Sequence, residues 1–191
     1  MKKEKAYERI YGIQLPENTR ANHRIRNRGY DREAAVAYAH RWWNSYNPDF
    51  RYFPVDCTNF VSQVLYAGGL PMEYTGKIDS GWWYSSNLGR NDQWSYSWAV
   101  AHSLRWYLAS QQGRRTLRVA AAEELSPGDV ICYDWDGDGV WEHNTVVVGF
   151  NGSGQPLVNA HTTNSQNRLW DYQNSLAWTE KTAYLFWRII Y

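Results

Sequence analysis

The sequence lacks the features that cross-link a chain or anchor it in a membrane. It has two cysteines in 191 residues, too few for a framework of disulfides, and a chain of this length can bury a core without one. No apolar run reaches the length of about 18 residues that spans a membrane, and the N-terminus lacks the apolar centre of a signal peptide. We therefore expect one folded domain that needs no disulfide.

The sequence also lacks a large net charge. It has 20 Lys and Arg residues against 19 Asp and Glu, a formal charge of +1, whereas domains that bind nucleic acid usually carry a strongly basic face. Basic residues do gather before position 30, but glutamates interrupt them. We interpret residues 1–29 as a polar, solvated extension in preference to a docking arm for an anionic polymer, and residues 30–191 as the domain.

One of the two cysteines stands where a helix is predicted to begin. Cys57 follows Pro54 and Asp56, and glycine at position 68 is typical of the helix end. Apolar residues follow the cysteine at helical spacing: Phe60, Val61, Val64 and Leu65. Unpaired N–H groups and the helix dipole at this position can lower a thiol pKa from about 8.5 to roughly 3.5–7.5, which favours a nucleophile. The alternatives are that Cys57 is a small buried apolar side chain or that it forms a disulfide with Cys132. We interpret Cys132 itself as a structural residue.

A histidine that can act as a base opens a predicted hairpin. His143 begins an alternating run over residues 143–150, and a turn rich in glycine separates it from residues 156–161. A short turn would pair position 143 with 161 and position 145 with 159, so Asn159 and His161 would share the face of His143. The predicted site is then Cys57 as nucleophile and His143 as base, with Asn159 or His161 orienting the imidazole.

Aromatic residues make up 17% of the chain and include 12 tryptophans. Trp82 and Trp83 lie in a segment rich in glycine, serine and asparagine, residues 70–93, which lacks clear periodicity. Such loops often carry binding residues, and aromatic faces stack on sugar rings. We therefore predict Trp82 and Trp83 as substrate-binding residues, with packing in the core as the alternative.

The residues just before His143 resemble the start of a calcium loop. Asp134, Asp136 and Asp138 occupy positions 1, 3 and 5, a glycine follows, and Glu142 falls at position 9. Position 12 is Thr145 where a bidentate glutamate is usual. The loop either binds a structural Ca²⁺ or is a polar hairpin without metal. The histidines and cysteines show no spacing typical of zinc, and the thiol chemistry requires no cofactor.

The order of the predicted elements indicates an α+β fold. Helices are expected from Asp31 to about Asn47, from Cys57 to about Gly68 and from about Ser97 to Gln111. Short strands follow, at residues 118–120, 130–133, 143–150, 157–162 and 183–190. Helices followed by strands predict N-terminal helices packed on a C-terminal antiparallel sheet.

Four segments in order resemble the putative amidase domain family of spore-forming and related bacteria. They are residues 30–36, 56–63, 127–131 and His143. The family is similar to the papain-like superfamily that contains the NlpC-type and CHAP cell-wall peptidases. The resemblance implies a papain-like fold and thiol-dependent hydrolysis of an amide bond in peptidoglycan. It also places Asn159 where NlpC-type relatives often carry a third, orienting histidine.

Two other functions remain open at this point. The aromatic loop and acidic turn also suit a non-catalytic module that binds a cell-wall glycan. The same Cys-His pair also suits an acyltransferase, in which an amine replaces water in the second step. A cell-wall hydrolase must meet its substrate, so we expect a trimmed precursor, action inside a sporulating cell or export by another route. The oligomeric state is left open.

Overall fold

A computed structural model describes residues 29–86 and 91–191 of the chain. The helices are α3 (Arg32–Trp42), α4 (Cys57–Ala67), α5 (Tyr96–Ala99), α6 (Ala101–Ser110) and the 3₁₀ turn η1 (Ala122–Glu124). The strands are β1 (Tyr84–Ser85), β2 (Gln93–Trp94), β3 (Thr116–Val119), β4 (Val130–Asp134), β5 (His143–Phe150), β6 (Pro156–Ala160), β7 (Ser165–Leu169) and β8 (Ala183–Ile189). The predicted extension, residues 1–29, lies outside the described residues except for Gly29.

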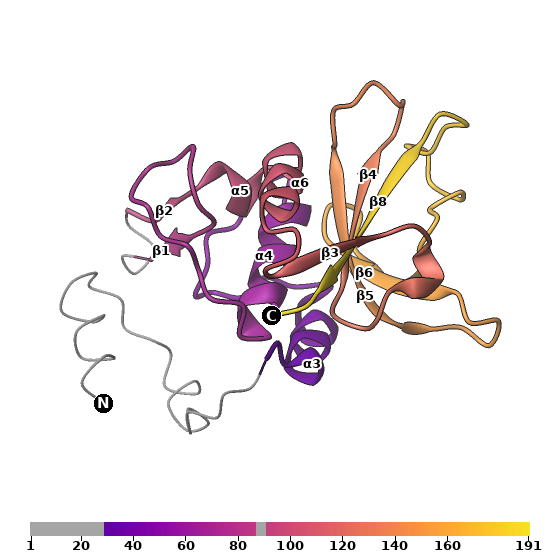
Figure 1. The fold of residues 1–191 in the computed structure, drawn as a ribbon, viewed down its shortest axis with the longest axis horizontal. Coiled ribbons are helices and arrows are strands. Elements are labelled where there is room, and N and C mark those ends of the chain that lie inside the picture. The colour runs from indigo at the N-terminus through magenta and orange to yellow at the C-terminus, as the bar shows by residue number, and fades with distance from the viewer. Residues whose placement is uncertain (1–28, 87–90) are drawn as a thin grey trace.

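The large sheet has six strands in the order β3-β8-β4-β5-β6-β7, and all neighbours are antiparallel. The α-helices gather on one side of it (Figure 1), and α4 and α3 contact the central strand β5. This arrangement confirms the α+β class and the packing of early helices on a later antiparallel sheet. The further expectation of a papain-like fold stays a prediction.

Capping residues set the helix boundaries where local signals predict them. Asp31 caps α3 by accepting the N–H of Ala34 at 3.0 Å, and α4 begins at Cys57 and ends at Ala67, with Gly68 as its C-cap. The predicted third helix is broken, because Val100 has the extended backbone angles φ −118° and ψ 124°. It therefore forms α5 and α6 as two shorter helices.

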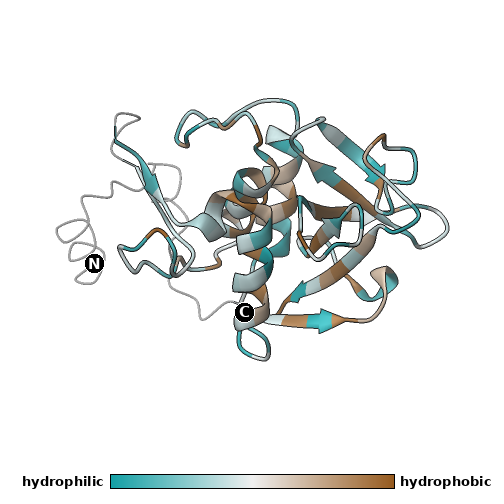
Figure 2. Cartoon of the chain, turned by 90° about the horizontal axis from the view of Figure 1, so that it is seen from above, coloured by the Kyte–Doolittle hydropathy of each residue, from teal (hydrophilic) through white to brown (hydrophobic). Residues whose placement is uncertain are grey.

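Apolar side chains form a core on each face of the sheet, and the strands carry many hydrophobic residues (Figure 2). The core on the helix side joins α4 to the sheet through Phe60, Val64, Val130, Cys132 and Val146, among others. The opposite face carries a second, smaller core that includes Ile131, Tyr133, Val147, Val158 and Tyr172. Successive residues of a strand point to opposite faces, so the face of each β5 residue decides which core it joins.

A buried ion pair fastens α3 to the sheet. Arg32 Nη1 lies 2.7 Å from Asp129 Oδ1, and the same guanidinium donates to the carbonyl oxygens of Pro127 and Ile189. Asp129 is fully buried and also accepts the N–H groups of Ser126 and Ile189. Burial raises the pKa of this carboxyl, and these donors and the Arg32 charge oppose the rise. Two of the segments that carry the family resemblance are thus in direct contact.

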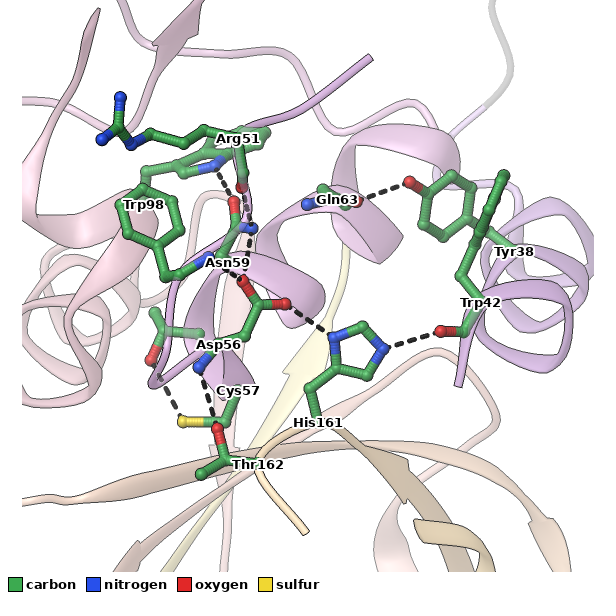
Figure 3. Close-up of polar contacts among 12 residues, drawn as sticks. Tyr38, Trp42, Arg51, Asp56, Cys57, Asn59, Gln63, Trp98, His161 and Thr162 are labelled. Carbon is green, nitrogen blue, oxygen red and sulfur yellow. Dashed lines mark hydrogen bonds and ion pairs between the residues drawn. The ribbon is translucent and has the colours of Figure 1, made fainter. Parts of the chain in front are cut away.

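The helices α3 and α4 are also joined to each other. The Tyr38 hydroxyl donates to Gln63 Oε1 at 2.6 Å and accepts from the amide of Asn47 (Figure 3). Gln63 is therefore a structural residue that joins the two helices. No helix within residues 29–86 and 91–191 has the length and apolar character needed to cross a membrane.

Candidate active site

The start of α4 docks against the start of β5. Cys57 Sγ lies 3.9 Å from the carbonyl oxygen of Glu142, and the backbone N–H of Asn144 donates toward the sulfur. The Asn144 side chain donates to Thr58 Oγ1 at 3.0 Å, and that hydroxyl lies 3.7 Å from Sγ. The residue between Glu142 and Asn144 is His143. The nucleophile candidate therefore touches the backbone on both sides of the predicted base.

The His143 ring lies in an aromatic enclosure. Its centroid is 5.5 Å from that of Tyr133, 5.7 Å from that of Trp135 and 5.4 Å from that of Tyr172. The side chain is 6% exposed, and its Nε2 atom is buried without a hydrogen-bond partner among the described residues. Burial, and secondarily the positive charge of Arg168, lower the pKa of His143 to about 3. The ring is therefore neutral at pH 7, and in this closed conformation it is a weaker base than an ordinary histidine.

The Cys57 thiol is also neutral in this conformation. Its side chain is buried, and burial raises its pKa although the Asn144 N–H and the Thr58 hydroxyl act in the opposite direction. The sequence prediction that helix position lowers this pKa is therefore wrong for the closed site. A thiolate needs either a proton transfer to His143 or an opening that admits water.

Asn159 does not reach His143. It pairs with Val146, so it lies on the helix-facing side of the sheet and not on the face of His143. Its Nδ2 donates to the carbonyl of Ala39 at 3.2 Å, and its Oδ1 accepts the N–H of Asn167 at 2.9 Å. The predicted register was wrong. Asn159 braces α3 and β7, and it does not orient the imidazole.

His161, the alternative orienting residue, is held by two acceptors (Figure 3). Its Nδ1 lies 2.6 Å from the Asp56 carboxylate, and its Nε2 lies 2.6 Å from the carbonyl oxygen of Trp42. Both of these neighbours are hydrogen-bond acceptors, and the contact with Asp56 has the geometry of a buried ion pair. Phe60 stacks on the ring at 4.2 Å. The pair fixes the residue that precedes Cys57 and leaves His143 untouched.

Asp56 is the centre of a network that sequence reasoning missed. It occupies the N-cap position of α4, but its side chain makes no capping hydrogen bond. Its Oδ1 accepts instead from the Phe53 N–H at 3.1 Å and the Asn59 amide at 2.9 Å, and its own N–H donates to Thr162 Oγ1 at 2.8 Å. The carboxylate thus sets the approach of the chain into the cysteine turn. The signal available in the sequence was the position of Asp56, an acid directly before the candidate nucleophile Cys57.

Trp82 and Trp83 are core residues, so the prediction that they face a sugar is wrong. Trp82 is fully buried, donates to Ser62 Oγ at 3.0 Å and stacks on Tyr107. Trp83 is 2% exposed and donates to the carbonyl of Ser80 at 3.0 Å. The segment is irregular, but its large rings fold back beneath α4 and α6 because each buries a large apolar area.

The two cysteines are both free. Cys132 lies in the middle of β4 with no exposed surface and belongs to the core on the helix side. Burial raises its pKa strongly. The alternative of a disulfide with Cys57 is therefore excluded, and Cys132 is structural as predicted.

The acidic loop brings four carboxylates together. Asp134, Asp136, Asp138 and Glu142 each offer an oxygen within 4.8 Å of the others. Asp134 is buried and accepts backbone N–H groups of the loop, and burial together with the neighbouring aspartates raises the pKa of Glu142. Oxygen ligands on a short loop suit Ca²⁺. A structural Ca²⁺ that fixes the entry to His143 stays a prediction.

The comparisons with known proteins bear on the family. A family model described as "Putative amidase domain" matches residues 29–187. The chain belongs to the putative amidase domain family. It is 49% identical over 162 residues to "Uncharacterized protein YhbB" of Bacillus subtilis (strain 168), covering 84% of this chain and 50% of that protein.

A second relative of this amidase-family chain is more distant. "Uncharacterized protein YjcM" of Bacillus subtilis (strain 168) is 28% identical over 157 residues, covering 78% of this chain and 34% of that protein. The chain thus spans about half the length of one relative and a third of the other. No solved structure matches it. Membership of the family suggests a hydrolase that acts on amide bonds.

Proposed function

We propose that the protein is a thiol-dependent amidase in which Cys57 is the nucleophile and His143 the base. The observation that carries the proposal is the docking of α4 on β5, which sets Cys57 Sγ against the backbone on either side of His143. His143 is neutral and has a free, buried Nε2, so it can receive the thiol proton. The family gives independent support for amide hydrolysis.

The reaction takes two steps. The Cys57 proton moves to the His143 imidazole while sulfur adds to the amide carbonyl carbon, and the amine leaves with that proton. Water then attacks the thioester, giving a carboxylic acid and restoring the thiol. The Cys57 N–H is one of the unpaired groups of the first turn of α4, so it can stabilise the oxyanion. The Asn159 side chain lies on the other face of the sheet and cannot orient the imidazole. Stacking on Trp135 orients it instead.

The substrate that we propose is an amide bond of cell-wall peptidoglycan. The support is the order of the sequence motifs, which resembles that of NlpC-type and CHAP cell-wall peptidases. A glycan-binding module loses its main support, because Trp82 and Trp83 are buried. Acyl transfer through the same thioester differs only in its second step, and an amine added to the reaction would appear in the product.

Digestion of purified peptidoglycan tests the proposal, with mass spectrometry of the released fragments and of new amino groups. We expect Cys57→Ser and His143→Gln each to lose at least about 10²-fold in rate, because each removes a group that the reaction needs. Cys132→Ala is the matched control and should retain activity. Equal product from Cys57→Ser and wild type would contradict the thiol mechanism.

A further inference from the structure

The proposed nucleophile and base are both covered. Cys57 is 2% exposed and His143 is 6% exposed, so an amide cannot reach the sulfur in this conformation. Tyr172 covers His143, since it is 3% exposed and its ring lies edge to face against the His143 ring at 5.4 Å, and it is close enough to Cys57 to interact with it electrostatically. Tyr172 follows β7 in the segment that returns to β8. Its ring must therefore move before a substrate can bind.

Backbone strain is concentrated in the same part of the chain. The described residues other than glycine that have positive φ are Thr162 (57°), Thr163 (67°), Asn167 (50°) and Tyr172 (56°). All of them lie within residues 162–172. A β-branched or bulky residue in the left-handed region is held there by its surroundings, and such residues cluster at functional sites. The cover over the cysteine is thus held in a strained form.

Arg168 fastens Tyr172 in place. Its guanidinium carbon lies 4.0 Å from the centroid of the Tyr172 ring, and its Nε and Nη2 donate to Asn174 Oδ1 at 3.0 and 2.5 Å. Arg168 therefore joins β7 to the turn that carries the ring. The contacts are a cation-π contact and hydrogen bonds to a neutral amide, which a better partner for the guanidinium can replace.

That better partner is a carboxylate. Arg168 forms no ion pair with a carboxylate of the described chain, although its positive charge acts on His143. Asp171, the acid nearest to Arg168 in sequence, accepts the N–H of Gln173, Asp56 is paired with His161, and Glu142 directs its side chain into the acidic loop. The guanidinium beside the covered pair is thus a free site for an anion, and a planar bidentate carboxylate matches its geometry.

We propose that Arg168 binds a carboxylate of the substrate, and that this contact draws Arg168 off Tyr172 and releases the ring from the Cys57–His143 pair. The substrate is then an amide with a carboxylate close to the scissile bond. The inference rests on the proposed function, because it assumes that Cys57 is the reacting group. Binding and opening are coupled, so a neutral amide leaves the site closed.

Two alkylating reagents of nearly equal size test the inference. Iodoacetate carries a carboxylate and iodoacetamide does not, and both alkylate a thiol at the same carbon. The rate at Cys57 is measured for each by peptide mass spectrometry at pH 8 and low salt, in folded and in urea-denatured protein. We expect the iodoacetate-to-iodoacetamide ratio to be about fivefold higher in folded protein, the factor given by an exposed ion pair of about 1 kcal/mol.

Three variants separate the parts of the inference. Arg168→Gln should return the ratio to its denatured value, and Arg118→Gln, an exposed arginine on β3, should leave it at the wild-type value. Tyr172→Gly removes the ring and relieves the positive φ, so both rates should rise about tenfold with the ratio kept. A folded ratio equal to the denatured one, or one unaffected by Arg168→Gln, would overturn carboxylate binding.

The remaining outcomes are equally decisive. Equal rates in Tyr172→Gly and wild type would overturn the role of the ring as a cover. If neither reagent labels Cys57 in folded Tyr172→Gly, whose folding is checked by its thermal melting curve, the thiol is unreactive and the proposed function fails. Fast labelling with an unchanged ratio leaves the thiol mechanism intact and removes the anionic substrate alone.

Discussion

The buried pair of Asp56 and His161 should be a main support of the nucleophile turn. His161→Gln removes the ring and, at most, remakes one of its two hydrogen bonds of 2.6 Å. A hydrogen bond to a charged group contributes about 1.5–3 kcal/mol, and removing one partner of a buried ion pair costs about 3–5 kcal/mol. Asp56 keeps two other donors, Phe53 N and Asn59 Nδ2. We therefore expect His161→Gln to lower the free energy of unfolding by about 2–4 kcal/mol.

Urea denaturation at pH 7 measures this loss, with His40→Gln as the matched control. His40 is half-buried and has only a 3.4 Å contact with Asn159, so its replacement should cost less than about 1 kcal/mol. The double variant Asp56→Asn with His161→Gln should cost less than the sum of the single changes, because each change removes the same pair. A loss below 1 kcal/mol for His161→Gln, or strict additivity, would refute the ion pair.

Three further predictions follow from the structure. Arg32→Ala leaves Asp129 buried without its ion-pair partner and should lower the free energy of unfolding by about 2–3 kcal/mol in urea denaturation, and an unchanged midpoint would contradict the contact. Because burial lowers the pKa of His143 to about 3 while the unfolded value is near 6.5, the unfolded chain binds more protons between these values, so stability should rise with pH across this window. His143→Gln should flatten that rise in urea titrations, and an equally steep curve would be contrary evidence. Ca²⁺ should raise the melting temperature of the wild type and not that of Asp136→Asn, and bound Tb³⁺ should show emission sensitised by Trp135. Equal melting curves with Ca²⁺ and with a chelator would argue for a metal-free hairpin.

Local signals predicted the helices that position the site. The capping side chain of Asp31 and the apolar spacing after Cys57 are short-range features, and both helices begin where these features indicate. The strand β7 was missed, because Ser165–Leu169 is mostly polar and lacks alternation. Its residues lie at the edge of the sheet, where a strand needs only one partner.

The register of the β5–β6 hairpin was predicted wrongly for two physical reasons. The turn is longer than expected, since Phe150 pairs with Pro156. If this were the only difference, Asn159 would still lie on the face of His143. A bulge between Val147 and Gly149 then shifts the pairing by one residue and moves Asn159 to the other face. A single inserted residue of this kind leaves no pattern in the sequence of the strand.

The network around Asp56 could not be predicted from sequence, because its partner His161 is 105 residues away. Burial also overturned the sequence predictions for the tryptophans and for the thiol. Composition placed Trp82 in an irregular segment, but the packing of the rings beneath the helices buries it. Helix position favoured a low pKa for Cys57, but desolvation dominates in the closed site and raises it.

The central claim is that Cys57 is a thiol activated by His143. The most direct test is the rate of iodoacetamide alkylation of Cys57 in folded Tyr172→Gly, in which the cover over the thiol is removed, with and without His143→Gln, between pH 5 and 10, with Cys132 in the same digest as the internal standard. The account predicts labelling of Cys57 far faster than that of Cys132, and a drop of about 10²-fold at pH 7 in His143→Gln. Labelling of Cys57 as slow as that of Cys132, or equal rates with and without His143, would contradict it.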